Sequence, residues 1–272
     1  MRSQNYGKAT KEFITFNCLR FLRARKFNMV DTKLMVKNYI NHLREIEKLE
    51  GVDFERKFRV IREIVSNGYY GIDKQGNPVY IDRIGLFDYD KFARQVDQEN
   101  LIDYYAYRWR QFFEIILPFC AHFAGRKVER ITSIIDCTNV QYSVFFRSKI
   151  RNAIKEAVRI SQDYYPELIS RVFVVNAPWS VKAIWNIVKN WIDAKTRKRI
   201  IIRREGRKEL LEFIDRDQLP VWLWGTNREP MNDFSGPWRN EIRSGIDRRT
   251  WNLNNNYWDY YLTSQERKLL DQ

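Results

Sequence analysis

Three short runs of almost uninterrupted apolar residues constrain the fold of this chain most strongly. They read ITSIIDC (131–137), RVFVVNA (171–177) and RIII (199–202), and stretches with helical spacing separate them. Strands this apolar are typical of a largely parallel sheet that is buried on both faces, because the helices between them supply the crossovers. The pattern therefore predicts an α/β domain.

Two further runs bring the predicted sheet to five strands. The segment DKQGNPVYIDRI is a turn followed by a β-rich run, in which Pro78 fits only at the start. VWLW (221–224) is a weaker fifth candidate. Helical spacing occurs near four ranges, which are 98–117, 144–162, 181–192 and 207–214.

The hydrophobic period divides the chain into three parts. Residues 12–66 have helical spacing throughout and predict a helical N-terminal unit. Residues 67–239 contain the alternating strands and helices of the α/β domain. Residues 240–272 form a tail that is rich in asparagine and aromatic residues, and the pattern predicts no structure for it.

The charge of the chain predicts a polyanionic partner. Lysine and arginine total 48 against 34 acids, a formal net charge of +14, and eight basic residues with one acid lie between Lys195 and Lys208. Such a surface attracts nucleic acid or the anionic face of a membrane. A solvated basic surface with no specific partner is a third interpretation, and charge alone does not choose among the three.

The chain shows no signals for export or for membrane insertion. Its first residues contain no apolar core of a signal peptide, and no run of eighteen apolar residues occurs. The three cysteines, Cys18, Cys120 and Cys137, are widely spaced and odd in number, which does not suit a disulfide framework. We therefore expect a protein of the reducing cytosol without a transmembrane segment.

The sequence lacks the motifs of the common α/β enzymes. No GxxxxGK[ST], GxGxxG or GxSxG occurs, so neither a phosphate loop nor a nucleophile elbow is predicted. The two histidines, His42 and His122, match no metal-binding spacing, and His42 is expected to be solvated on the polar side of its helix. These patterns favour a protein that is not an enzyme, with no catalytic residue, metal site or cofactor.

The stretch VKAIWNIVKNWID (181–193) has an unusually broad apolar face. Its large apolar residues fall within an arc of roughly 160° at a hundred degrees per residue. Spacing alone favours a crossover helix packed on its sheet. Two tryptophans beside lysines, ahead of a basic run, equally suit a helix at a lipid interface, so the segment leaves both interpretations open.

Six motifs occur in a fixed order between residues 12 and 239. They are LRFLRARKF (19–27), DKQGNPVY (73–80), SQDYYPELISRVFVVNAP (161–178), KELL (208–211), LPVWLWG (219–225) and GPWR (236–239). In sequence and order they resemble the motifs of CRAL-TRIO domains, and most of all those of the yeast-type phosphatidylinositol/phosphatidylcholine transfer proteins. The resemblance implies a helical N-terminal unit followed by a sheet that floors a hydrophobic pocket. It also implies that a mobile helix closes the pocket.

The resemblance also implies the roles of individual residues. An inositol headgroup would contact Arg25, Lys26, Glu167 and Lys208, which pair cations with phosphate and a carboxylate with hydroxyls. A choline headgroup would contact Tyr70, Tyr80 and Ser133, since quaternary ammonium binds tyrosine faces. Leu168 and Ile131 depart from the family pattern at these two sites. The implied lid helix presents Val181, Ile184, Trp185, Val188, Trp191 and Ile192.

The function implied is extraction and exchange of phosphatidylinositol, phosphatidylcholine or both between membranes. The protein would act as a cytosolic monomer that visits anionic membranes, with the Golgi and endoplasmic reticulum suggested by the family, and would bind no nucleic acid. Two alternatives stay open: a lipid sensor that presents its ligand to a partner enzyme without transferring it, and a basic nucleic-acid-binding protein, although no nucleic-acid-binding motif occurs.

Overall fold

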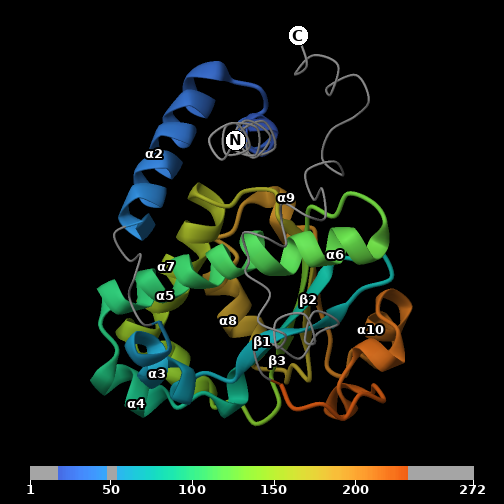
Figure 1. Cartoon of the computed structure of the whole chain (residues 1–272). Coiled ribbons are helices and arrows are strands. Elements are labelled where there is room, and N and C mark those ends of the chain that lie inside the picture. The colour runs from blue at the N-terminus through green and yellow to red at the C-terminus, as the bar shows by residue number, and fades with distance from the viewer. Residues whose placement is uncertain (1–17, 48–53, 232–272) are drawn as a thin grey trace.

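The structure is a computed structural model that describes residues 18–47 and 54–231. Its centre is a five-stranded sheet with the strands in the order β1-β2-β3-β4-β5 (Figure 1). β1 pairs antiparallel with β2, and the other pairs are parallel. The strands are β1 (Asn67–Ile72), β2 (Pro78–Arg83), β3 (Ile131–Asp136), β4 (Ile169–Val175) and β5 (Ile200–Ile202). The predicted α/β class with a largely parallel sheet is confirmed.

Helices precede the sheet, connect its parallel strands and follow it. Residues 18–24 are helical, and α2 and α3 lie between them and β1. The helices are α2 (Met29–Glu47), α3 (Phe54–Ile64), α4 (Tyr89–Gln95), α5 (Gln98–Gln111), α6 (Leu117–Ala124), α7 (Ser148–Asp163), α8 (Val181–Val188), α9 (Ala194–Arg197) and α10 (Arg207–Phe213). No helix in the described parts of the chain is both long and apolar enough to cross a bilayer.

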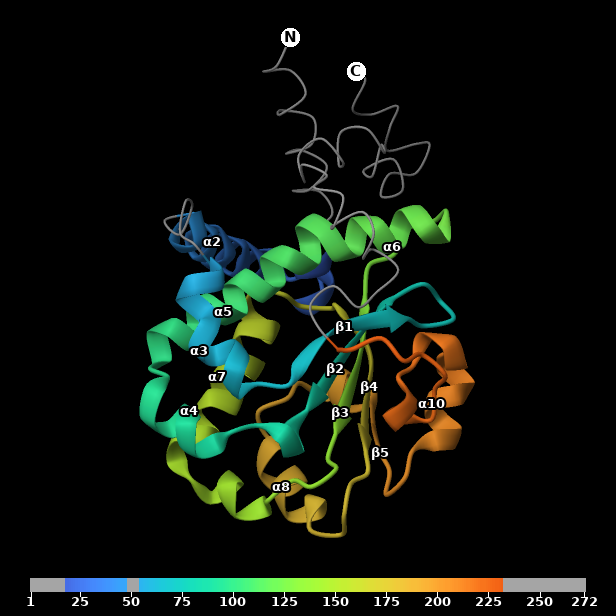
Figure 2. The same cartoon turned by 60° about the horizontal axis from the view of Figure 1, so that its bottom comes forward.

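The two faces of the sheet are covered differently. One face packs against α10 and the turn that follows it, and we call this the packed face. Its buried residues include Tyr70, Val79, Ile81, Ile134 and Phe173. The other face lies towards α5, α6, α7 and α8. Figure 2 shows α7 and α8 on the side of the strands opposite α10.

The predicted fifth strand is wrong, because a different segment completes the sheet. Residues 221–223 form a 3-10 turn, and Trp224 ends it with a left-handed φ of 61°. The fifth strand is instead β1, whose sequence NGYYGI contains two glycines and was missed because glycine depresses strand propensity. It is held as the edge strand of an antiparallel pair with β2.

Three helical boundaries differ from those predicted. The helix expected near 98–117 continues to Ala124 through a π-helical segment, Phe112–Ile116. The helix expected over 181–192 ends at Val188, and the one expected near 144–162 begins at Ser148. The predicted division at 66/67 falls between α3 and β1, whereas residues 12–17 and 232–239 and the tail 240–272 lie outside the described residues.

His42 is buried rather than solvated. Its ring stacks on Tyr164 with the centroids 4.0 Å apart, and Nε2 lies 3.2 Å from the Tyr165 hydroxyl oxygen. Burial, with a smaller contribution from Arg159, lowers the pKa of His42 to about 4. His42 thus packs α2 against the turn before β4, because Tyr164 and Tyr165 of that turn cover its ring and exclude solvent.

Candidate functional site

The sheet face opposite α10 retains accessible surface, and we call it the open face. Along β2 and β3 every side chain on the packed face except Arg83 is buried, whereas Tyr80, Asp82, Ser133 and Ile135 on the open face are only half-buried. Val172 on β4 is half-buried as well. An inner strand with helices on both sides normally has both faces buried, so the helices over the open face do not pack tightly on its centre.

Asp82 shows that this accessible surface is shielded from bulk water. The side chain is half-buried by area, yet burial raises the pKa of its carboxyl to about 7, although Arg108 lowers it. A carboxyl in contact with bulk water would keep a pKa near 4. The Asp82 carboxyl on the open face therefore lies away from bulk water.

The predicted lid helix covers part of this face. In α8 the apolar residues Val181, Ile184, Trp185 and Val188 are half-buried, and none of its residues is fully buried. Val181 packs on a cluster that contains Val174 and Ile135 of the open face. Just before the helix, Trp179 is 87% exposed. A helix with this much apolar surface and so little burial is held by few contacts.

Specific hydrogen bonds hold both ends of the α8 segment. At its start, Asn176 has a left-handed φ of 53° and its side chain donates to Asp136 Oδ1 at 2.8 Å. At its end, the amide of Gln162 on α7 donates to the Trp191 carbonyl at 2.8 Å and accepts from the Asp193 backbone N–H at 2.6 Å. Trp191 and Ile192, which were predicted to belong to the lid helix, lie in the turn that Gln162 binds.

The structure brings together two of the three predicted choline-site residues. Tyr80 and Ser133 are paired in the register of β2 and β3 and both lie on the open face. Tyr70 is fully buried on the packed face, where its hydroxyl donates to the Glu229 carbonyl at 2.8 Å. Its neighbour Tyr69 contacts Tyr80 instead, with ring centroids 5.1 Å apart.

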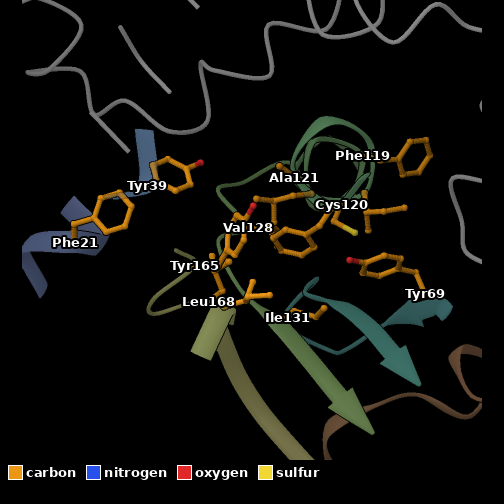
Figure 3. Packing of buried hydrophobic residues seen from close by; sticks show 14 of the residues in the cluster. Phe21, Tyr39, Tyr69, Phe119, Cys120, Ala121, Val128, Ile131, Tyr165 and Leu168 are labelled. Carbon is orange, nitrogen blue, oxygen red and sulfur yellow. The ribbon is translucent and has the colours of Figure 1, made fainter. Parts of the chain in front are cut away.

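The position of Tyr69 follows from the alternation of side chains along a strand. Neighbouring residues of a strand point to opposite faces, so only one of the two adjacent tyrosines reaches the open face. Figure 3 shows Tyr69 extending from β1 towards the cluster around Cys120 and Ile131. A one-residue difference in alignment therefore changes which face of the sheet the assigned tyrosine occupies, and the choline-binding role of Tyr70 stays a prediction.

Glu167 lies at the centre of a charged cluster before β4. It has a left-handed φ of 63°, and its two carboxylate oxygens each lie 2.6 Å from Lys195 Nζ on α9. Arg199 follows at 3.7 Å, and burial together with the charge of Arg130 lowers the pKa of this guanidinium. One carboxylate thus faces several cations, an arrangement that can bind phosphate and hydroxyl groups together.

The other predicted inositol-site residues divide between the two ends of β4. Arg25 and Lys26 follow a helix whose Phe21 packs in the same cluster as Tyr165, so they lie on the Glu167 side. Lys208 lies in the first turn of α10, two residues after Gly206, which contacts Val175 at the opposite end of the strand. The length of β4 is about 20 Å, so one headgroup does not reach both Glu167 and Lys208. These roles remain predictions.

Sequence reasoning did not single out Tyr69, Asp82, Arg108, Lys195 or Arg199, which the structure places beside predicted site residues. The last two belong to the basic run between 195 and 208, which was interpreted only as a surface that attracts anions. Asp82 alternates with Tyr80 on β2, so the period of the strand could have placed it on the same face. Arg108 gave no signal, because a basic residue on an amphipathic helix is usually solvated.

Together these features define a class of α/β domain in which an amphipathic helix covers an accessible, largely apolar sheet face. The chain belongs to the CRAL/TRIO domain family, whose sequence model matches residues 63–225. A solved structure of Sfh5 has the same fold, with a TM-score of 0.60 at 16% identity over 86% of this chain and 81% of that one.

Relatives of known name cover most of this chain. The phosphatidylinositol/phosphatidylcholine transfer protein SFH12 of Arabidopsis thaliana is 32% identical over 82% of this chain and 42% of its own length. The Sec14 cytosolic factor of Schizosaccharomyces pombe is 30% identical over 82% of this chain and 79% of its own length. The chain therefore spans about two fifths of the plant relative and about four fifths of the yeast one.

Proposed function

We propose that this chain is a phospholipid-transfer module that extracts phosphatidylinositol, phosphatidylcholine or both from one membrane and delivers it to another. The observation that carries the proposal is the half-buried open face of the sheet, part of which α8 covers. A lipid needs an apolar surface that a protein element can shield from water, because each methylene exposed to water costs about 0.8 kcal/mol and two acyl chains contain many. The names of the plant relatives, which are called transfer proteins for these two lipids, support the same conclusion.

In this proposal α8 is the gate of the pocket. Its apolar side would cover the acyl chains in the closed state and contact the membrane in the open state. The exposed ring of Trp179 supports the membrane contact, since tryptophan favours the interface between lipid and water. In the basic run between Lys195 and Lys208, every cation except Arg199 is exposed, which favours an anionic leaflet by about 1 kcal/mol for each well-placed charge.

The two headgroup regions take separate roles. Tyr69, Tyr80 and Ser133 would form a subsite on the open face, and Arg25, Lys26, Glu167, Lys195 and Arg199 would form a second subsite before β4. The protein would act as a monomer in the cytosol, with Golgi or endoplasmic reticulum membranes as donor or acceptor. It would carry only its phospholipid, without a cofactor, a nucleic acid or a covalent reaction.

A transfer assay between two vesicle populations tests this function. Donor vesicles carry a labelled phosphatidylinositol or phosphatidylcholine, and the label in acceptor vesicles is measured with and without the protein. We expect label to move with the protein present. Lipid that is bound but never delivered would instead support the sensor hypothesis, and failure to load any lipid would refute both.

A variant that fills the pocket sharpens the test. Val172→Trp adds bulk to the open face, so it should block lipid loading while the protein stays folded. The control is Val221→Trp, because Val221 is 54% exposed on the other side of the sheet. If Val172→Trp unfolds the chain and the control does not, the open face is solidly packed and the proposal fails.

A further inference from the structure

The aromatic faces of the open-face subsite already hold a cation of the protein itself. The guanidinium carbon of Arg108, on α5, lies 5.1 Å from the ring centroid of Tyr69 and 5.5 Å from that of Tyr80. Both distances are within the range of a cation–π interaction. The two tyrosines that would receive a quaternary ammonium group are thus in contact with an arginine.

Arg108 is fixed in this position. It is 5% exposed, and its Nη1 donates to Gln111 Oε1 at 3.1 Å. Gln111 in turn donates from Nε2 to the Tyr107 hydroxyl at 2.8 Å, and both of these residues are buried. The Tyr69 hydroxyl also lies 3.4 Å from the Arg108 carbonyl oxygen. Displacing the guanidinium would break its hydrogen bond to Gln111 and leave the buried Gln111 Oε1 without this donor.

A charged guanidinium in this place opposes a second cation and attracts an anion. Like charges repel strongly in a space that excludes bulk water, whereas arginine binds phosphate through planar, paired hydrogen bonds. Asp82 and Arg108 both act on the hydroxyl of Tyr80. Burial raises the pKa of this hydroxyl, the charge of Arg108 lowers the pKa, and the charge of Asp82 raises it. Because the pKa of Asp82 is itself about 7, this carboxyl offsets only part of the arginine charge at neutral pH.

We propose that Arg108 is a specificity-determining residue that makes the Tyr69–Tyr80 subsite accept anionic phospholipid headgroups and reject choline. This inference rests on the proposed lipid-transfer function and narrows it, because both lipids named there carry a phosphodiester but only phosphatidylcholine adds a quaternary ammonium. The chemistry recognised is a phosphate group with no cation attached to it.

Lipid loading from mixed vesicles tests the inference. The purified full chain is incubated with phosphatidylethanolamine vesicles that contain equal amounts of phosphatidylcholine, phosphatidylinositol and phosphatidic acid with identical acyl chains. The protein is then repurified and its lipid is identified by mass spectrometry. We expect the wild type to load the two anionic lipids at least tenfold over phosphatidylcholine. Equal loading, or a preference for phosphatidylcholine, overturns the inference, whereas the absence of any lipid refutes the transfer function itself.

Variants assign the preference to Arg108. Arg108→Gln should shift the ratio at least tenfold towards phosphatidylcholine, and Arg108→Lys should keep the anionic preference because it keeps the charge. Arg94→Gln is the matched control, since Arg94 is exposed on α4, and it should leave the ratio unchanged. Circular dichroism establishes folding. If Arg108→Gln does not fold, the lipid ratios of the wild type and of Arg108→Lys test the assignment. Loss of the preference for anionic lipids in Arg108→Lys would then overturn it.

A further arm separates a lipid headgroup from soluble phosphate. Glycerol 3-phosphate at millimolar concentration carries the same charge without acyl chains. It should not reduce loading of phosphatidic acid, because the apolar face supplies most of the binding free energy. Strong competition by glycerol 3-phosphate would show a site for soluble phosphates and overturn the inference.

Discussion

Removing the Gln162 side chain should release the end of the α8 segment. Its amide makes two hydrogen bonds to the backbone around Trp191 and Asp193, at 2.8 and 2.6 Å. At about 1 kcal/mol each, their loss in Gln162→Ala destabilises the attached state by about 2 kcal/mol. Since 1.4 kcal/mol corresponds to a factor of ten, the detached population should rise by roughly 30-fold.

The loss should stay local. α8 has no fully buried side chain, so few apolar contacts oppose its opening. The Asp193 side chain still caps α9 by accepting from the Lys195 and Thr196 N–H groups, both at 2.9 Å, so the chain after the turn should keep its structure. The melting temperature should therefore change little.

Hydrogen exchange followed by mass spectrometry measures this opening directly. Peptides that cover residues 181–193 should exchange roughly 30-fold faster in Gln162→Ala, and peptides of β3 and β4 should not change. Lipid transfer should also accelerate if opening of α8 limits it. Gln95→Ala, at an exposed position on α4, is the control. Unchanged exchange over 181–193 would refute the view that Gln162 secures this helix.

Three further predictions concern stability. Burial lowers the pKa of His42 to about 4 from 6.5, so the folded state binds fewer protons than the unfolded state. The free energy of unfolding should therefore fall by about 2 kcal/mol between pH 7 and pH 5. Urea titrations of His42→Leu should show no such dependence on pH. Phe173→Ala should cost about 3–5 kcal/mol in urea denaturation, because the ring is fully buried, whereas Phe146→Ala, 63% exposed, should cost less than about 0.5 kcal/mol. Tyr70→Phe should lose about 1 kcal/mol with its hydrogen bond to the Glu229 carbonyl, yet leave lipid loading unaffected, and altered loading would place Tyr70 in the pocket after all.

Strands β3, β4 and β5 were predictable because their sequences are almost continuously apolar. Such runs with few polar residues are typical of parallel strands that lie between helices. β1 was not predictable in the same way, since Gly68 and Gly71 weaken its signal and a register shift between Tyr69 and Gly71 disturbs its pairing. The choice between Tyr69 and Tyr70 depends on this register, which local sequence does not determine.

The charged contacts of the candidate site could not be predicted because they join distant segments. Glu167 meets Lys195 across the whole α8 segment, and Arg108 reaches Tyr69 and Tyr80 from a crossover helix. The motif resemblance identified Glu167 but placed Lys208 on the same inositol headgroup, and Lys208 lies at the other end of β4. Trp224 is a different case, because its left-handed φ of 61°, a conformation that favours glycine, gives no signal in the sequence.

The tight packing between the sheet and α10 has a consequence for the empty protein. The packed face has a core of its own, formed by Tyr70, Phe173, Leu210 and their neighbours. This core contains no residue of the open face, so release of a lipid from the open face should leave it intact. A lipid carrier built in this way can release its lipid at one bilayer and diffuse to the next in the lipid-free state without unfolding.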